Sequence, residues 1–285
     1  MKVVMLAAGY ATRLESVTDG GKIAKTMLSI SDSNGKKQPM LYHLLDKINE
    51  VNNPERNFPI DEIVIVTNEK YRKQIFEACK NYGSWIDIKI ISNGCKDKSE
   101  SKGANADLQL GLDYVKGSGA DVMILASDNY FDFSLVDLMN EFDNKSVSDD
   151  DISMIVTKTF PEEKKDYYHN GFAIVESDEN GLITNFVEKP AKDGIEINSH
   201  DAAIALYLLR SSNVKLIDKY MEKYNDLSNP VHKKKRDSLG YFGRYITKHS
   251  PTYNYSIGNS LFIDIGTPEE YAKVSDYKLK QEKSI

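Results

Sequence analysis

The sequence predicts an α/β fold in which a mostly parallel central sheet is flanked by helices. Two observations lead to this prediction. Short, wholly apolar runs at residues 3–8, 63–66 and 121–126 are typical of strands that are buried on both faces. Segments with apolar residues at helical spacing lie between these runs, and repeated alternation of strand and helix is typical of a parallel sheet.

The first half of the chain is predicted to hold most of this parallel sheet. Gly9 ends its first strand, and a polar stretch rich in small residues follows. Strands are expected at residues 3–8, 63–66, 86–91 and 121–126, and helices at 39–51, 69–81 and 104–115. Because parallel sheets bind ligands at the carboxyl ends of their strands, we expect the loops after Ala8 and Ala126 to meet at one functional edge.

The second half of the chain is predicted to be richer in strands. Strands are expected at residues 152–157, 171–176, 182–188 and 202–209, a hairpin turn at 178–181, a helix at 214–224, and loops at 143–151 and around Asn229. We interpret the basic run at 233–236 as a solvated loop. A strand at 261–265 leads to a helix that Thr267 caps, with Glu270 as the reciprocal partner of the cap.

The composition is that of a globular chain of 285 residues, because 40% hydrophobic residues are enough for a sizeable core. The net charge of −6 argues against general binding of nucleic acid or of an anionic membrane, since both need a basic face. The apolar run at the amino terminus is too short for a signal peptide, and no run approaches the ~18 residues of a membrane span. With only two cysteines, the chain is expected to be cytoplasmic.

The first segment that suggests chemistry is Leu-Ala-Ala-Gly-Tyr-Ala-Thr-Arg-Leu at residues 6–14. Here a predicted strand enters a tight loop of small residues, whose backbone N–H groups can approach a polyphosphate. Arg13 offers a fork of hydrogen-bond donors and Lys25 a compact positive charge. An ordinary strand-to-helix turn with two solvated cations explains the same residues, so the segment alone leaves both interpretations open.

A second segment, Ser-Asp-Asn at residues 127–129, stands at the carboxyl end of a predicted strand. The Asp128 carboxylate can hold Mg²⁺, a hard cation that prefers oxygen ligands. A turn or capping aspartate is the alternative interpretation of this tripeptide.

Together the segments resemble the sugar-1-phosphate nucleotidyltransferases, from Val3 to about Tyr271. Residues 6–14 are similar to the family signature Leu-Ala-Ala-Gly-x-Gly-Thr-Arg-Leu, and residues 186–190 contain the family's Val-Glu-Lys-Pro. Residues 262–268 resemble its Trp-x-Asp-Ile-Gly-Thr-Pro segment.

Two departures from the family pattern matter. Ala11 stands at the family's second glycine, where a Cβ could crowd the phosphates, and Ala24 stands at its proline. The spacer before Lys25 is also longer than usual by about two residues, so Lys22 competes with Lys25 for the role of the family lysine. We favour Lys25, because residues 26–30 continue in the register of the family.

The resemblance implies a Rossmann-like nucleotidyltransferase fold in one domain, residues 1–285. Residues 1–150 would bind the nucleotide, and the β-rich residues 151–285 would bind the sugar phosphate. The implied reaction joins a nucleoside triphosphate to a sugar-1-phosphate, releases pyrophosphate and depends on Mg²⁺. TTP or UTP is the favoured nucleotide, CTP is possible, and relatives often assemble as homo-oligomers.

The resemblance and the neighbouring tyrosines also give a set of expected site residues. The catalytic residues would be Arg13 and Lys25, and the metal ligands Asp128 and Asp264. The nucleotide-binding residues would be Leu6, Ala8, Gly9, Tyr10, Ala11, Thr12, Gly103 and Asp128. The sugar-phosphate-binding residues would be Gly171, Glu188, Lys189 and Tyr207.

Three other functions compete with this one. A cytidylyltransferase for a non-sugar phosphate such as phosphocholine shares the opening segment, but the Glu188–Lys189 pair fits a sugar phosphate better. Glycosyltransferases on related folds usually offer Asp-x-Asp to their metal, whereas this chain has Asp-Asn-Tyr at 128–130. A catalytically silent nucleotide-binding regulator stays open because of Ala11 and Ala24, and pyrophosphate release would separate it from an enzyme.

Overall fold

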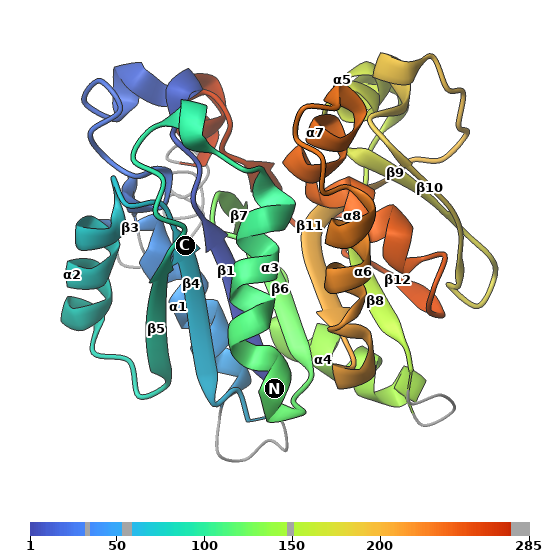
Figure 1. The fold of residues 1–285 in the computed structure, drawn as a ribbon, viewed down its shortest axis with the longest axis horizontal. Coiled ribbons are helices and arrows are strands. Elements are labelled where there is room, and N and C mark those ends of the chain that lie inside the picture. Colours follow the sequence, from blue (N-terminus) through green and yellow to red (C-terminus); the bar gives the residue numbers. More distant parts are fainter. Residues whose placement is uncertain (32–34, 53–58, 147–150, 275–285) are drawn as a thin grey trace.

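A mixed sheet forms the centre of the structure, and helices cover both of its faces (Figure 1). The computed structural model describes residues 1–31, 35–52, 59–146 and 151–274. The strands are β1 (Lys2–Ala7), β2 (Ser29–Ser31), β3 (Lys37–Pro39), β4 (Glu62–Thr67), β5 (Asp87–Ser92), β6 (Val122–Ala126), β7 (Asn129–Phe131), β8 (Ser153–Thr159), β9 (Ala173–Ser177), β10 (Ile183–Glu188), β11 (Asp201–Leu209), β12 (Thr252–Ser256) and β13 (Phe262–Asp264).

The α-helices and the short 3₁₀ turns connect these strands. The helices are α1 (Met40–Val51), α2 (Arg72–Tyr82), α3 (Ala104–Val115), α4 (Leu135–Ser146), α5 (Lys165–Gly171), α6 (Leu216–Lys223), α7 (Pro230–Asp237) and α8 (Leu239–Ile246). The 3₁₀ turns are η1 (Thr12–Val17), η2 (Lys25–Met27), η3 (Lys98–Glu100), η4 (Lys116–Ser118), η5 (Glu162–Lys164), η6 (Pro190–Asp193) and η7 (Ser211–Asn213).

The large sheet has nine strands within the described residues, and its main path is β10-β9-β11-β6-β1-β4-β5. β6, β1, β4 and β5 run parallel to one another, as the alternation of strands and helices predicts. β11 joins β6 antiparallel and so carries the sheet into the second half of the chain, where β8 pairs with β11 and β12 pairs with β8. The predicted α/β class with a largely parallel central sheet is confirmed.

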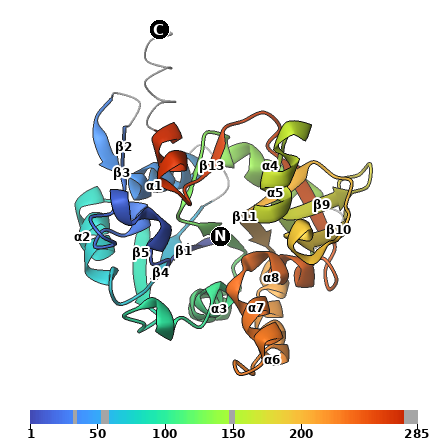
Figure 2. The same cartoon turned by 90° about the horizontal axis from the view of Figure 1, so that it is seen from above.

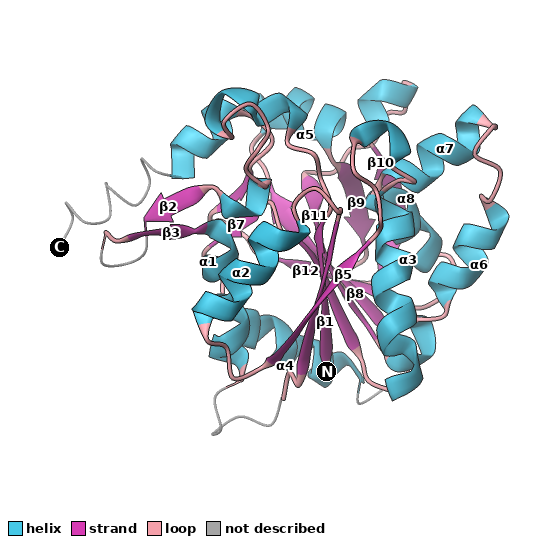
Figure 3. Cartoon of the chain, turned by 60° about the vertical axis from the view of Figure 1, so that its left-hand side comes forward, coloured by secondary structure: helices cyan, strands magenta, loops and turns pink. Residues whose placement is uncertain are grey.

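Alternate residues of β1 pack into two different cores because side chains alternate between the faces of a strand. Val3 and Met5 lie in a cluster with residues of α1, α2 and α4, whereas Val4 lies in a cluster with residues of α3, α6 and α8. Figure 3 shows α1 and α2 on one side of the strands and α3 and α6 on the other. Burial on both faces explains why these strands are wholly apolar.

The strands predicted in the second half of the chain are present, and several helices there were not predicted. The turn between β9 and β10 is the expected hairpin, in which the Asp178 carboxylate accepts hydrogen bonds from the N–H groups of Asn180 and Leu182, both at 2.9 Å. The expected cap at Thr267 is also present, because its N–H donates to Glu270 Oε2 at 3.0 Å and its hydroxyl accepts from the Glu270 N–H at 3.3 Å.

Two loop predictions are wrong. The basic run at 233–236 lies within α7, whose amino end Asn229 caps by accepting a hydrogen bond from the Val231 N–H at 2.9 Å. The consecutive cations leave no apolar residues at helical spacing in this segment. In the sequence, only the capping residue Asn229 and Pro230 in the first turn indicate the helix. In the loop predicted at 143–151, residues 143–146 belong to α4, and residues 147–150 lie outside the described residues.

Cys79 and Cys95 are both free and buried, and burial raises the pKa of the Cys79 thiol to about 11.

In the part of the chain that the structure describes, none of the helices combines the length and the apolar character that crossing a bilayer requires.

The close approach of α3 to the sheet at Gly111 gives a first testable prediction. A Cβ at Gly111 would lie 2.5 Å from Val4 Cγ1 and 2.9 Å from Val66 Cγ2. We expect Gly111→Ala to lower the free energy of unfolding by about 1–3 kcal/mol through overpacking, although alanine usually favours a helix. Urea denaturation measures this change.

Gly117→Ala is the matched control because a Cβ there would meet no atom within 4 Å. This control should keep the stability of the unsubstituted protein. A Gly111→Ala variant that is as stable as the control would contradict the packing argument.

Candidate functional site

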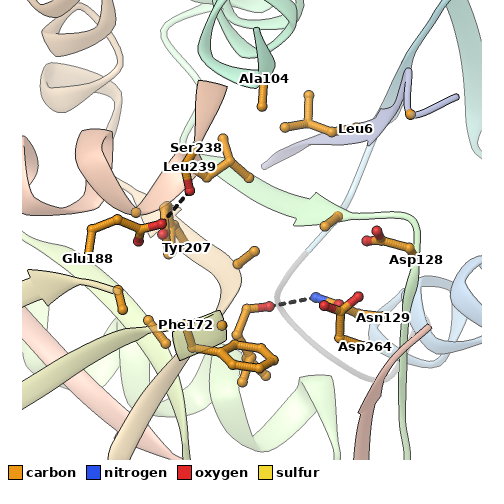
Figure 4. Close-up of a pocket in the computed structure, with 18 of the residues that line it drawn as sticks. Leu6, Ala104, Asp128, Asn129, Phe172, Glu188, Tyr207, Ser238, Leu239 and Asp264 are labelled. Atoms are coloured by element: carbon orange, nitrogen blue, oxygen red, sulfur yellow. Dashed lines mark hydrogen bonds between the residues drawn. The ribbon is translucent and has the colours of Figure 1, made fainter. Parts of the chain in front are cut away.

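Two adjoining cavities lie beyond the carboxyl ends of β1 and β6. The first has a volume of about 300 Å³, and its lining includes Leu6, Asp128, Glu188, Tyr207 and Asp264 (Figure 4). The second has a volume of about 570 Å³ and is lined by residues 8–14, Lys25 and several basic side chains from distant parts of the chain. The residues that line both cavities are Ala8, Gly9, Ala104, Asp107 and Asp237.

The ends of β1 and β6 are fixed together at this edge. The Ser127 N–H donates to the Leu6 carbonyl at 2.9 Å, immediately after β6 ends. The loop that follows β1 is held from the α2 side, because Asn68 Nδ2 donates to the Ala8 carbonyl at 2.9 Å. The expectation that these two loops meet at the carboxyl edge of the sheet is therefore met.

A short antiparallel pairing brings two distant aspartates together. β13 pairs with β7 so that Asp264 is the register partner of Asn129, and the Ile265 N–H donates to the Asp128 carbonyl at 3.0 Å. Asp264 is largely buried, and this burial, with the nearby charge of Asp128, raises the pKa of its carboxyl group. The two carboxylates are thus held close enough to repel each other.

Lys25 provides the opposite charge. Its Nζ lies 2.6 Å from Asp128 Oδ2, and its side chain is only 16% exposed. Burial by itself would lower the pKa of Lys25, but the carboxylates of Asp128 and Asp264 outweigh this effect and raise it. Lys22, the other candidate from the sequence, pairs instead with Asp19 at 3.1 Å in solvent and does not line either cavity.

The loop after β1 has a left-handed residue at the position where the related family has glycine. Ala11 has φ 53° and ψ 26°, and its carbonyl accepts the Leu14 N–H at 2.9 Å as η1 begins. This conformation favours glycine because an L-residue's Cβ crowds the backbone there. The methyl group of Ala11 is buried and packs in a small core with Leu14, although the residue also borders the second cavity.

Three neighbours of Ala11 also line the second cavity. Arg13 is exposed and lies near Gly266, where an added Cβ would be 3.0 Å from its Nη2. Among the described residues, none forms a hydrogen bond with the buried Tyr10 hydroxyl, and burial raises the pKa of Tyr10 to about 12. Thr12, the first residue of η1, is exposed between them.

Glu188 is the central polar residue of the first cavity on the side opposite Asp128 and Asp264 (Figure 4). Its carboxylate accepts a hydrogen bond from Ser238 Oγ at 2.5 Å (Figure 4) and lies 3.2 Å from Lys189 Nζ. Lys189 has φ 47°, a left-handed bend that brings these consecutive side chains together. A Cβ at Gly240, at the start of α8, would overlap the Glu188 carboxylate, so a larger residue there would displace this carboxylate from its present place.

Two of the three other residues expected to bind the sugar phosphate line the first cavity together with Glu188. Gly171 and Tyr207 line the first cavity, whereas Lys189 is not part of its lining. Burial and the Glu188 charge raise the pKa of the Tyr207 phenol, so it stays protonated. β11 bulges between Ala203 and Tyr207, with φ 56° at Ala205, and this puts small side chains on the cavity wall.

Gly103 is placed differently from the expectation. A Cβ there would lie 2.5 Å from the Arg236 carbonyl oxygen, so Gly103 packs against the end of α7 and lines neither cavity. Its neighbour Asp107 lines both cavities and was not predicted. Burial raises the pKa of Asp107 to about 6, although a hydrogen bond from Asn93 Nδ2 at 2.7 Å opposes this shift.

Sequence reasoning missed several residues that surround the first cavity. Asn129 could have been found, because it follows Asp128 directly, and its Nδ2 donates to the Ile204 carbonyl at 2.5 Å (Figure 4). Ser238, Gly240 and Ala205 had no recognisable signal, because only the packing of α8 and the bulge of β11 bring them to the site.

The chain matches one family and several solved structures. The family model for nucleotidyl transferases matches residues 2–281. No curated protein has a significant sequence match to the chain. A UDP-glucose pyrophosphorylase complexed with UDP-glucose has a TM-score of 0.71 and 17% identity, over 98% of each chain.

Two further structures are similar. A protein assigned as a glucose-1-phosphate thymidylyltransferase from Bacillus anthracis, in complex with sucrose, has a TM-score of 0.70 and 18% identity, over 98% of this chain and 95% of that one. The UTP-bound UGPase from Acinetobacter baumannii has a TM-score of 0.67 and 14% identity, over 97% of this chain and 92% of that one. At such low identity these likenesses establish the fold alone.

The left-handed conformation of Ala11 gives a prediction about stability. Ala11→Gly relieves the backbone strain but loses a buried methyl group. We therefore expect the free energy of unfolding to stay unchanged or to rise by up to about 1 kcal/mol in urea denaturation.

Ala24→Gly is the control, because Ala24 is also buried but has φ −61°, where glycine brings no relief. It should lower the free energy of unfolding by about 1–2 kcal/mol. Equal destabilisation by both substitutions would show that Ala11 is not strained.

Proposed function

Because this chain belongs to the nucleotidyl transferase family, we propose that it transfers a nucleotidyl group from a nucleoside triphosphate to a sugar-1-phosphate. The products are a nucleoside diphosphate sugar and pyrophosphate. The observation that carries this proposal is the cluster of Lys25, Asp128 and Asp264 beside two adjoining cavities. One cavity is lined by Arg13, Lys25 and the small-residue loop after β1, which suit a triphosphate, and the other by Glu188 and Tyr207, which suit a sugar.

In the proposed reaction an oxygen of the sugar's phosphate attacks the α-phosphorus of the nucleotide. A new P–O bond forms, the bond from the α-phosphorus to the bridging oxygen breaks, and pyrophosphate leaves with that electron pair. A phosphate monoester is already an anionic nucleophile at neutral pH, so the reaction needs little help from a general base. The protein's task is to position two anions and to neutralise the charge that develops.

Lys25 is the residue best placed for this task. Its raised pKa keeps it a cation, and it lies against Asp128 at the edge of both strands. Arg13 and the backbone N–H groups of residues 9–12 would neutralise the terminal phosphates from the adjoining cavity. On the other side, Glu188 would accept a hydrogen bond from a sugar hydroxyl, and Lys189 would attract the sugar's phosphate.

Asp128 and Asp264 would hold Mg²⁺, and their chemistry fits this ion. Both offer hard oxygen ligands. Burial first, and then the charge of Asp128, raise the pKa of Asp264, and a bound cation would stabilise both carboxylates in their charged form. Among the described residues, no group of three or more histidine, cysteine or acidic side chains is arranged to hold a metal. Mg²⁺ suits such a site because it is usually bound by one or two carboxylates together with water and substrate phosphates. When bound, the ion would neutralise phosphate charge during transfer.

The solved structures support the choice of substrates. One similar protein binds UTP, another binds UDP-glucose, and a third is assigned as a glucose-1-phosphate thymidylyltransferase. We therefore propose UTP or TTP as the nucleotide and a hexose-1-phosphate as the acceptor. Residues 1–150 would supply the nucleotide side of the cleft, and residues 151–285 the sugar side. The placement of Lys25 beside both aspartates supports an enzyme over a silent nucleotide-binding regulator.

A pyrophosphate-release assay across nucleoside triphosphates and sugar-1-phosphates tests this function. We expect release with TTP or UTP and a hexose-1-phosphate, and loss of that release when EDTA removes divalent ions. Release only with CTP and phosphocholine would favour the cytidylyltransferase, and the absence of release with every acceptor would favour the regulator.

Another prediction concerns the two candidate lysines. Lys25→Ala should lower kcat by ~10²–10³-fold, because it removes a cation that acts on the reacting phosphates. Lys22→Ala is the matched control and should keep near-normal kcat, because its partner Asp19 lies in solvent. Circular dichroism would confirm that both variants are folded. The opposite result, with Lys22 essential and Lys25 dispensable, would assign the role to Lys22.

A further inference from the structure

The second cavity has an unusual charge for an acidic protein. Five cationic side chains and two carboxylates line it, although the whole chain has a net charge of −6. Arg13 and Lys25 belong to the site already described. The other three cations are Lys98 in η3 and Lys233 and Lys234 in α7. Figure 1 shows η3 and α7 at the same upper end of the molecule as the loop after β1.

The backbone of α7 is fixed in place beside this cavity. Asn105 Nδ2, near the start of α3, donates to the carbonyls of Lys235 at 3.0 Å and Ser238 at 2.8 Å. The Tyr220 hydroxyl of α6 also donates to the Lys235 carbonyl, at 2.6 Å. Gly103 allows the close approach of the two helices, since any Cβ there would collide with the α7 backbone. The lysines of α7 therefore extend from a rigid support.

The three additional lysines differ in whether their charge is already paired. Lys234 Nζ lies 2.7 Å from Asp193 Oδ1 and above the Tyr241 ring. Within the described residues, Lys98 and Lys233 have no ion-pair or hydrogen-bond partner for their side chains, and both are exposed. Two unpaired cations from separate elements thus border the cavity that residues 9–13 also line.

We propose that Lys98 and Lys233 bind the two terminal phosphates of the nucleotide and retain the pyrophosphate as it leaves. This inference rests on the proposed function and adds two phosphate-binding residues to it. A nucleoside triphosphate carries most of its charge on the β- and γ-phosphates, and lysine binds phosphate as a point charge. Because that charge stays on the leaving group, the same lysines would bind free pyrophosphate.

The experiment compares Lys98→Ala, Lys233→Ala and the double variant with the unsubstituted full chain. Titration calorimetry with inorganic pyrophosphate gives the Kd, and the pyrophosphate-release assay gives KM for UTP and for the sugar-1-phosphate. We expect each single substitution to raise both the pyrophosphate Kd and the KM for UTP by about three- to tenfold. The KM for the sugar-1-phosphate should change by less than about twofold, because the first cavity does not include these lysines.

Lys219→Ala is the matched control, since Lys219 is an exposed lysine of α6 that lines neither cavity. It should bind pyrophosphate as the unsubstituted protein does. Lys98→Arg and Lys233→Arg should keep most of the affinity, because both retain the charge. Equal urea midpoints would show that none of these substitutions unfolds the chain.

Two results separate this inference from the proposed function. A double variant that binds pyrophosphate as tightly as Lys219→Ala would overturn the role of the lysines, even in an active enzyme. If no sugar-1-phosphate supports pyrophosphate release, the proposed function fails, but the calorimetric titration still decides whether Lys98 and Lys233 bind phosphate.

Discussion

The pairing of β7 with β13 is the constraint on which the candidate site depends. It places the buried carboxyl group of Asp264 beside Asp128, at the carboxyl edge of the parallel strands. Two like charges in a partly buried place repel each other, and Lys25 compensates for them by its contact with Asp128. Partly burying three charged side chains lowers the free energy of unfolding unless a bound cation or anionic ligand offsets their charges. The presence of this cluster therefore indicates function rather than a contribution to stability.

The distribution of charge supports the same conclusion. Acidic residues outnumber basic ones over the whole chain, yet cations gather around the cavity beside the loop after β1. Because an acidic surface repels polyphosphates in general, only a local concentration of positive charge can attract them. The arrangement favours binding in this cleft over non-specific binding of anions elsewhere.

Backbone strain is also concentrated at the cleft. Of the four non-glycine residues with positive φ in the described chain, Ala11 and Ala205 line a cavity and Lys189 adjoins Glu188. Lys189 and Ala205 bend the backbone where a strand ends or bulges, and Ala11 bends it where η1 begins. Strain of this kind persists only where the surrounding structure enforces it, and it clusters at functional sites.

Local sequence determined the buried strands, α3, the hairpin between β9 and β10 and the cap at Thr267, because apolar periodicity and capping act between residues that are near in sequence. Its motifs also pointed to residues that line the two cavities, among them Arg13, Asp128 and Glu188. Only the tertiary structure decided that Lys25 rather than Lys22 meets Asp128, that Gly103 packs against α7, and that the basic run forms a helix beside the cleft. These outcomes depend on contacts between residues far apart in the chain, which no local pattern encodes.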